Sequence, residues 1–167
     1  MHREIRDWFR QLWDEHPALF HNKRVLECGS RMVNGGTISG FFADCEYTGL
    51  DAISGRGVDV VGLAHEYQPA EPLDVVVCCQ MLEHDPHWRE SVAHMAEMTA
   101  PGGALILTFP DKGWLPHGDD YTPEQGYYHN PDKDEIIDIL TPAFEQVEWQ
   151  IERLTVLLLA TDRKATA

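Results

Sequence analysis

The stretch with the clearest capacity for ligand chemistry is VLECGSRMVNGG at residues 25–36, where an acid and a glycine follow a short apolar run. Dinucleotide sites carry the pattern G-x-G-x-x-G, whose glycines let backbone amides at a helix N-terminus approach a pyrophosphate. The position two residues after Gly29, where this pattern needs its second glycine, holds Arg31. The spacing therefore argues against a pyrophosphate and predicts a ligand that lacks one.

A second acidic residue, Asp51, ends the apolar run YTGLD and lies 24 residues after Glu27. Nucleotide-binding sheets place a ribose-binding acid about 20 residues beyond their glycine motif. An aspartate at such a place can also do no more than cap a turn. The interval favours the ligand-binding interpretation, with both acids at the carboxyl ends of strands, where parallel sheets bind their ligands.

Apolar, β-branched runs predict the strands that must position these acids. Several runs are continuous rather than alternating, as expected of strands that are buried on both faces of a sheet. The predicted strands are RVLEC (24–28), YTGLD (47–51), VDVV (58–61), DVVVCC (74–79), ALILTF (104–109), VEWQI (147–151) and TVLLLAT (155–161).

Three helices are predicted from apolar spacing and from end signals. The first spans residues 1–16, and the third begins near Asn130-Pro131. The second has Asp85 as its N-cap and Pro86 in its first turn, and it stops at APGG (100–103). Their apolar faces are Ile5, Trp8, Phe9, Leu12 and Trp13; Trp88, Val92, Met95, Ala96 and Thr99; and Ile136, Ile137 and Leu140. This order of elements predicts an α/β fold: a Rossmann-like, mostly parallel sheet of about seven strands with helices on both faces, in a single compact domain over residues 1–167.

The links on both sides of the predicted strand VDVV are short. AISGRG and AHEYQPAEPL are shorter than the dozen or more residues that a parallel crossover usually needs. Either a helix is absent there or VDVV is irregular. We therefore expect loops instead of helices on one face of the sheet in this region.

Composition restricts the location and the partners of the chain. Of 167 residues, 13 are basic and 28 acidic, and the net charge of −15 disfavours nucleic acids because it repels phosphate backbones. No apolar run approaches the roughly 20 residues of a membrane span, and no signal peptide is recognised, so a cytoplasmic location is expected.

The cysteines lack C-x-x-C spacing and are interpreted as buried, reduced packing residues. They are Cys28, Cys45, Cys78 and Cys79.

Five segments, in the expected order, resemble the class I S-adenosylmethionine-dependent methyltransferases, of the group with a methyltransferase type 11 core. These are VLECGSRMVNGG, YTGLD, GVDVVGLAHE, DVVVCCQMLEHDPHW and APGGALILTFP. The resemblance covers a core of about residues 24–161, which follows the helix of residues 1–16. Each segment alone is weakly specific, but five in register make a strong signal. The resemblance implies S-adenosylmethionine as cofactor and methyl transfer to a small molecule or a basic protein.

The same resemblance implies which residues hold the cofactor. Glu27 would hold the loop or the methionine ammonium, Gly29 would let the backbone approach, and Asp51 would accept hydrogen bonds from both ribose hydroxyls. Ser30, Asn34 and Gly35 would shape the loop around the methionyl end, although Asn34-Gly35 alone is typical of an ordinary tight turn. The complete predicted cofactor set is Glu27, Cys28, Gly29, Ser30, Asn34, Gly35, Asp51, Ala52, Leu63, Ala64, His65 and Gln80.

Leu63, Ala64 and His65 fall where the family holds the adenine, usually with an acid that reaches its amino group. Leu63 stands at the position of that acid. The departure predicts that adenine is held by apolar contacts and the Ala64 backbone, or that Glu66 or another group substitutes.

His84 follows the fourth strand, beside the transferring methyl group in this architecture, and is the candidate catalytic general base. Its reference pKa of about 6.5 suits that role. Methyl transfer is served largely by proximity and alignment, so the alternative is that His84 has only a structural role.

A metal-assisted RNA 2′-O-methyltransferase group has Glu-x-x-Glu-His at this location, but in this chain Gln80 replaces the first glutamate. Metal binding is therefore a minority alternative, and no metal ligands are assigned.

The acceptor site is predicted to come from the N-terminal helix and from residues 110–131, a long aromatic segment interpreted as a candidate substrate lid. Its candidate substrate-binding residues are Trp114, His117, Tyr121, Tyr127, Tyr128 and His129. The alternative is that these side chains only cover a bare sheet edge.

Two other classes of function stay open. A nicotinamide-dependent oxidoreductase is disfavoured by the missing G-x-G-x-x-G, and a catalytically silent methyltransferase-like subunit would bind the cofactor and a partner protein.

Overall fold

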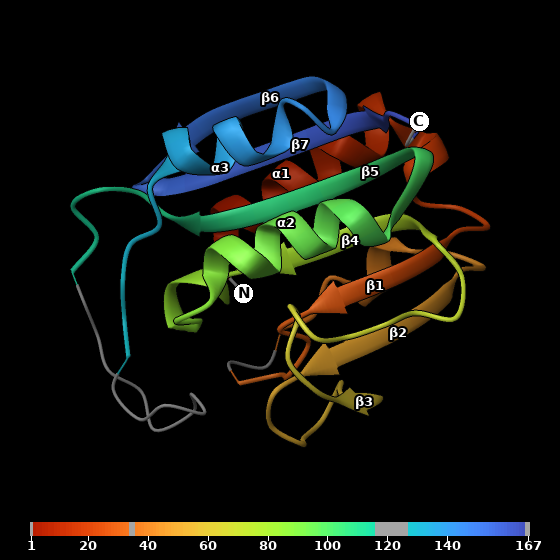
Figure 1. The fold of residues 1–167 in the computed structure, drawn as a ribbon, viewed down its shortest axis with the longest axis horizontal. Helices are drawn as coiled ribbons and strands as arrows, with labels where there is room; N and C mark the ends of the chain where they lie inside the picture. The colour runs from red at the N-terminus through yellow and green to blue at the C-terminus, as the bar shows by residue number, and fades with distance from the viewer. Residues whose placement is uncertain (1, 34–35, 116–126, 166–167) are drawn as a thin grey trace.

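In the part of the chain that the structure describes, the sheet has seven strands in the order β3-β2-β1-β4-β5-β7-β6 (Figure 1). The computed structural model describes residues 2–33, 36–115 and 127–165. Strands β1 to β5 run parallel to one another, whereas β7 is antiparallel to both β5 and β6. The bounds are β1 Arg24–Cys28, β2 Glu46–Asp51, β3 Val60–Val61, β4 Leu73–Cys79, β5 Thr99–Pro110, β6 Phe144–Glu152 and β7 Thr155–Arg163. The predicted α/β class with a mostly parallel sheet is confirmed.

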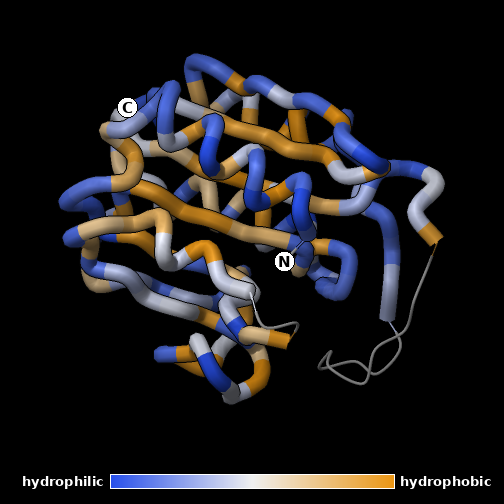
Figure 2. Tube along the Cα trace, turned by 180° about the vertical axis from the view of Figure 1, so that it is seen from behind, coloured by the Kyte–Doolittle hydropathy of each residue, from blue (hydrophilic) through white to orange (hydrophobic). Residues whose placement is uncertain are grey.

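Helices cover both faces of this sheet, as predicted. Helix α1 (Arg3–Glu15) lies on one face, and α2 (Trp88–Met98) and α3 (Lys133–Leu140) lie on the other (Figure 1). The central strands serve two apolar cores, since Val75 and Val77 of β4 pack with α1, while Val76 and Cys78 pack with α2 and α3. Burial on both faces explains the continuous apolar runs, seen as long orange stretches through the middle of the sheet in Figure 2.

Loops replace helices around the short strand β3, as the sequence led us to expect. Only two residue pairs, Leu50–Val60 and Asp51–Val61, join β3 to β2, so the predicted strand VDVV is shortened to its last two residues. In the described residues, the segments between β1 and β4 contain one short 3₁₀ turn, η2 (Ser39–Phe41), and no α-helix. Separately, no described helix has the length and apolarity to cross a membrane.

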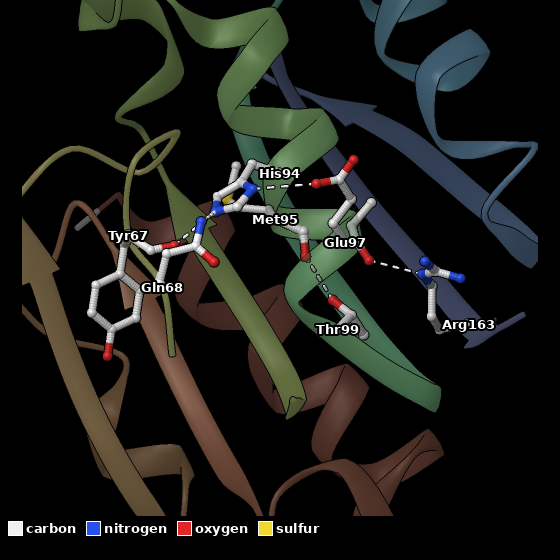
Figure 3. A network of polar contacts seen from close by, with 8 residues as sticks. Tyr67, Gln68, His94, Met95, Glu97, Thr99 and Arg163 are labelled. Atoms are coloured by element: carbon white, nitrogen blue, oxygen red, sulfur yellow. Dashed lines mark hydrogen bonds and ion pairs between the residues drawn. The ribbon is translucent and has the colours of Figure 1, made fainter. Parts of the chain in front are cut away.

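Polar contacts join the C-terminal half of α2 to the loop between β3 and β4 and to the end of β7 (Figure 3). His94 Nε2 donates a hydrogen bond to the Tyr67 carbonyl oxygen at 2.7 Å, in the loop between β3 and β4. Arg163 Nε at the end of β7 donates to the Ala96 carbonyl oxygen at 2.8 Å. These contacts hold α2 and, with it, the segment after β4 that leads into the helix.

The predicted boundaries of α2 are wrong at both ends. At the start, Asp85 Oδ1 accepts a hydrogen bond from His87 N at 2.8 Å, which forms a turn before the first helical residue, Trp88. At the end, Thr99 is already the first residue of β5, and its Oγ1 donates to the Met95 carbonyl oxygen at 2.8 Å. APGG therefore lies inside β5, where the pairing with β4 is irregular, as glycines allow.

The cysteines are free, but two of them are less buried than predicted. Cys28 and Cys78 are buried, whereas Cys45 and Cys79 are only half-buried. Cys45 lies just before β2, where its Sγ contacts Lys23 N at 3.4 Å, so it is close to the surface. Cys79 is the last residue of β4, where the core opens at the end of the sheet.

Helix α3 begins at Lys133 rather than at Asn130-Pro131, and Asp132 is its N-cap. The Asp132 carboxylate accepts a hydrogen bond from Asp134 N at 2.9 Å and lies 2.9 Å from Lys112 Nζ.

Replacing Asp132 by alanine should lower the free energy of unfolding by about 1 kcal/mol, because a first-turn N–H loses its acceptor. Urea denaturation measures the change. Asp138→Ala, on the exposed side of the same helix, is the matched control, and an equal loss in both variants would contradict the capping role.

Candidate active site

A cavity of about 340 Å³ lies at the carboxyl ends of β1, β2 and β4. Strands β1 and β4 are neighbours although β2 and β3 lie on the other side of β1, so the strand order reverses at this point. Ligands of open parallel sheets bind at such a reversal, and the volume is typical of a small-molecule site. All ten described residues of the predicted cofactor set line the cavity: Glu27, Cys28, Gly29, Ser30, Asp51, Ala52, Leu63, Ala64, His65 and Gln80. Asn34 and Gly35 lie outside the described residues.

Gly29 makes the turn at the end of β1 against the segment that follows β4. Its φ is +80°, and its N–H donates to the Leu50 carbonyl oxygen at 2.8 Å. A Cβ at this position would lie 2.6 Å from Met81 Cβ, closer than carbon atoms approach. Only glycine fits here, so the backbone at the end of β1 packs directly on the wall formed after β4.

Glu27 is a buried carboxylic acid in the wall of the cavity, with 7% of its surface exposed. Tyr47 Oη donates a hydrogen bond to its Oε2 at 2.6 Å. Burial raises the pKa of Glu27 to about 7, the Tyr47 hydrogen bond opposes this rise, and the Asp51 carboxylate adds to it. Glu27 therefore changes its charge near neutral pH, and in its ionised form it can bind a cation.

Asp51 at the end of β2 ties together the two loops that border the cavity. Its Oδ2 accepts a hydrogen bond from Arg31 N at 3.1 Å, and its Oδ1 accepts one from Ile53 N at 2.9 Å. A carboxylate has about four acceptor positions, so each oxygen can accept a further hydrogen bond from a ligand. The side chain is only half-buried and lines the cavity, as its predicted role requires.

The residues predicted to hold an adenine, Leu63, Ala64 and His65, form another part of the wall. The ring of His65 packs on that of His87, with centroids 4.6 Å apart. In the described part of the chain, the buried His65 Nδ1 has no hydrogen-bond partner. Glu66, the suggested substitute for the missing acid, is largely exposed and is absent from the described cavity lining. His65 is thus the polar side chain of this group that faces the cavity.

The segment after β4 brings Gln80 and His84 to the cavity. Gln80 has a φ of +53°, unusual for a residue with a side chain, and its N–H donates to the Thr108 carbonyl oxygen at 2.8 Å. Such backbone strain is concentrated at functional sites. The 3₁₀ turn η3 (Leu82–His84) then places His84 and the buried Glu83 in the same wall.

Of the predicted substrate-binding residues, Trp114 lines the cavity. It packs edge-on against His2, with ring centroids 5.6 Å apart. Tyr128 packs against His84 at 5.3 Å, and its pKa is raised by burial and by the Glu83 carboxylate.

The other predicted substrate residues that the structure describes do not line the cavity. Tyr127, Tyr128 and His129 are absent from the described lining, although His129 N donates to the Glu83 carbonyl oxygen at 2.9 Å and so lies beside η3. His117 and Tyr121 lie outside the described residues, as does the whole of 116–126 within the predicted lid.

Several cavity residues were missed by the sequence analysis. The missed lining residues are His2, Ile5, Arg31, Val33, Gly36, Thr37, Ile38, Leu50, Gly62, Cys79, Met81, Glu83, Asp85, Pro86 and His87. Most of them flank the predicted motifs, so wider margins around each motif would have included them. His2 and Ile5 belong to the N-terminal segment that was expected to contribute to the acceptor site, but only the packing of α1 shows that these two residues reach the cavity. Among the described residues, no group of three or more His, Cys, Asp or Glu side chains is arranged to hold a metal ion.

Comparison with known proteins places the chain in a family. Residues 1–153 match the family model of the methyltransferase domain. The 1,6-didemethyltoxoflavin-N1-methyltransferase of Burkholderia thailandensis, solved with 1,6-didemethyltoxoflavin and S-adenosylhomocysteine, is 17% identical, with a TM-score of 0.67 over 94% of this chain and 78% of that one. The N-methyltransferase NodS of Bradyrhizobium japonicum WM9, solved with S-adenosylhomocysteine, is 18% identical, with a TM-score of 0.66 over 94% and 86%. No curated protein sequence matches the chain.

The family match covers most of the chain, and the structural neighbours share its fold over nearly its full length. Both findings agree with the resemblance seen in the five sequence segments and with the residues that meet around the cavity. The chain belongs to the methyltransferase domain family and is an S-adenosylmethionine-dependent methyltransferase with the class I fold.

Proposed function

We propose that this protein transfers the methyl group of S-adenosylmethionine to a small-molecule acceptor inside the cavity at the end of β1, β2 and β4. The observation that carries the proposal is that Glu27, Gly29 and Asp51, from two different strand ends, line one cavity of about 340 Å³. Such a cavity accommodates small molecules rather than a folded partner. The net charge of −15 also disfavours a nucleic-acid acceptor.

The residues of the cavity fit the cofactor. Glu27 would bind the ammonium of the methionyl group, the tight turn at Gly29 leaves the backbone accessible, and Asp51 would accept hydrogen bonds from the ribose hydroxyls. Leu63 and His65 would contact the adenine, with the unsatisfied His65 Nδ1 available to its polar edge. When bound, S-adenosylmethionine supplies an electrophilic methyl group on a sulfonium sulfur.

The acceptor would be held by the part of the wall that comes from distant segments. His2 and Ile5 of the N-terminal region, Trp114 after β5 and His84 after β4 line the same cavity. Trp114 would exclude water and align a flat or apolar acceptor, since alignment supplies much of the rate of a displacement reaction. His84 would accept the proton that an O–H or N–H acceptor releases. The didemethyltoxoflavin bound to the Burkholderia enzyme is a small molecule of this kind.

Calorimetric titration with S-adenosylhomocysteine, followed by a metabolite screen for methylated products, tests the proposal. We expect saturable binding and at least one methylated small molecule. Binding without any product would favour the catalytically silent subunit, and absence of binding would overturn the proposal. Methylation of a basic protein by the same preparation would contradict the proposed small-molecule acceptor but would leave the proposed methyl transfer unchanged.

Trp114→Ala should separate the acceptor from the cofactor. Affinity for S-adenosylhomocysteine should stay within a few fold, while turnover of the acceptor found in the screen falls at least about tenfold, or about 1.4 kcal/mol in barrier. Single-turnover and binding measurements on the same protein provide both values. Trp149→Ala on the edge strand β6 is the matched control, because Trp149 packs on Lys133 away from the cavity. Equal losses of affinity and turnover in Trp114→Ala would make Trp114 a structural residue.

A further inference from the structure

Tyr47 is a partly buried side chain whose role follows from the register of two strands. In the pairing of β1 with β2, Tyr47 lies opposite Val25, and Gly49 lies opposite Glu27. Tyr47 is therefore diagonal to Glu27 on the same face of the sheet. Its hydroxyl reaches Glu27 Oε2 at 2.6 Å, a short hydrogen bond to a carboxylate.

This hydrogen bond occupies one oxygen of a carboxylate that faces a ligand cavity. Within residues 2–33, 36–115 and 127–165, the other oxygen, Oε1, accepts no hydrogen bond, although Glu27 lines the cavity. A buried carboxylate is stabilised in its ionised form by donors such as a phenol. Tyr47 itself stays protonated, because burial and the Glu27 charge raise its pKa. It is thus a permanent donor over the whole physiological pH range.

We infer that Tyr47 is a positioning residue for cofactor binding: its hydroxyl favours the ionised form of the Glu27 carboxylate and orients it in the cavity for the ammonium of the cofactor. The inference rests on the proposed function. It adds a residue that does not line the cavity and acts on the ligand only through Glu27.

Other charged and titratable groups surround Glu27, and they do not replace Tyr47. Asp51 on β2 raises the pKa of Glu27, whereas the hydrogen bond from Tyr47 lowers it. The neighbouring thiols, Cys28 on β1 and Cys79 on β4, remain neutral because burial raises their pKa. The remaining charged or titratable groups that line the same cavity are His2, Arg31, His65, Glu83, His84, Asp85 and His87.

The direction of the pH dependence follows from the raised pKa of an acid. Glu27 is neutral below a pH of about 7 and ionised above it, so affinity for an ammonium ligand should rise as the pH rises through this value. Tyr47→Phe removes the hydrogen bond that opposes the shift and should move the midpoint to a pH about 1 higher. The phenyl ring keeps the packing of Tyr47 on Phe42, whose ring centroid lies 5.7 Å away.

The test has two readouts. In the protein without ligand, the Glu27 carboxyl carbon is followed by NMR in glutamate-labelled protein, and the midpoint should be near 7 in the wild type and about 1 higher in Tyr47→Phe. Calorimetric titration with S-adenosylhomocysteine gives the second readout. At the pH of the wild-type midpoint, Tyr47→Phe should bind about fivefold more weakly than the wild type. At a pH about two units higher, the affinities of the two proteins should agree within twofold. Comparison at equal pH cancels the titration of the ligand itself.

Three controls make the outcome decisive. Tyr67→Phe, a partly buried tyrosine in the core on the other face, should leave both readouts unchanged. Glu27→Gln should bind weakly at every pH and lose the dependence. 5′-Methylthioadenosine, which lacks the ammonium, should bind to the wild type and to Tyr47→Phe with equal affinity.

An unchanged Glu27 midpoint in Tyr47→Phe, or a wild-type midpoint at the ordinary value for glutamate, would overturn the inference. Absence of S-adenosylhomocysteine binding to the wild type would instead overturn the proposed function, while the NMR titration still reports on the Tyr47–Glu27 pair.

Discussion

Asp51→Ala is expected to weaken the binding of S-adenosylhomocysteine by at least about 30-fold, or about 2 kcal/mol. Two losses add up in this variant. The ribose hydroxyls would lose their charged acceptor, and the loops after β1 and β2 would lose the hydrogen bonds from Arg31 N and Ile53 N that Asp51 accepts. The loop after β1 carries much of the cavity wall, so its displacement would also disturb the methionyl end of the site.

A nearby aspartate provides the control for this effect. Asp59 Oδ2 accepts a hydrogen bond from Gly49 N at 2.8 Å, so Asp59→Ala also removes a carboxylate that binds the backbone of β2, but Asp59 is absent from the described cavity lining. The affinity of Asp59→Ala for S-adenosylhomocysteine should stay within a few fold of that of the wild type. Calorimetry on both variants, with circular dichroism to confirm folding, measures the difference. Wild-type affinity in folded Asp51→Ala would remove Asp51 from the site.

Gly29→Ala should lower the free energy of unfolding by about 3 kcal/mol. A side chain at a φ of +80° costs about 1 to 2 kcal/mol, and overpacking adds about 1 to 3 kcal/mol. The overlap arises because the new Cβ would lie 2.6 Å from Met81 Cβ and 2.9 Å from its Cγ. Met81 Cβ is held close to the backbone, so rotation of the side chain does not remove the clash. Separation of the turn from Met81 would also open the cavity and weaken cofactor binding.

Gly102→Ala isolates the conformational part of this cost. Gly102 has a similar φ of +77°, but no heavy atom lies within 4 Å of the position of an added Cβ. Its free energy of unfolding should therefore fall by about 1 kcal/mol only, the cost of the positive φ. Denaturant titration of both variants gives the two values. Equal destabilisation would show that contact with Met81 contributes nothing and that the turn is not packed as described.

The sequence alone was sufficient for the fold class and for the positions of the main candidate residues of the cavity. Apolar, β-branched runs located the strands of the described sheet, and the continuous runs marked strands such as β4 and β7 that are buried along most of their length. Glu27 and Asp51 could be recognised because each stands at the end of such a run, and strand ends meet at one edge of a parallel sheet. The absence of the second glycine after Gly29 argued against a dinucleotide fingerprint. These features depend on a few neighbouring residues.

The boundaries of elements were predicted less well, because competing local interactions decide them. Asp85 was expected to cap α2 and instead forms a turn with His87 N, and Thr99 was expected on α2 but begins β5. In both cases side chain and backbone had two acceptable arrangements, and packing against the rest of the sheet selected one. The short strand β3 follows the same rule, since only two of its residues reach a position beside β2.

Tertiary structure alone decided which distant residues share the cavity. His2 and Trp114 meet at its wall although more than half of the chain separates them, and Tyr47 reaches Glu27 only because β1 and β2 pair in one particular register. Strand order and register depend on the summed packing of the whole sheet, not on any local pattern, and a shift by one residue would turn Tyr47 to the opposite face. The sequence therefore determined which residues end the strands, and the folded sheet determined which groups contact them and set the charge of Glu27.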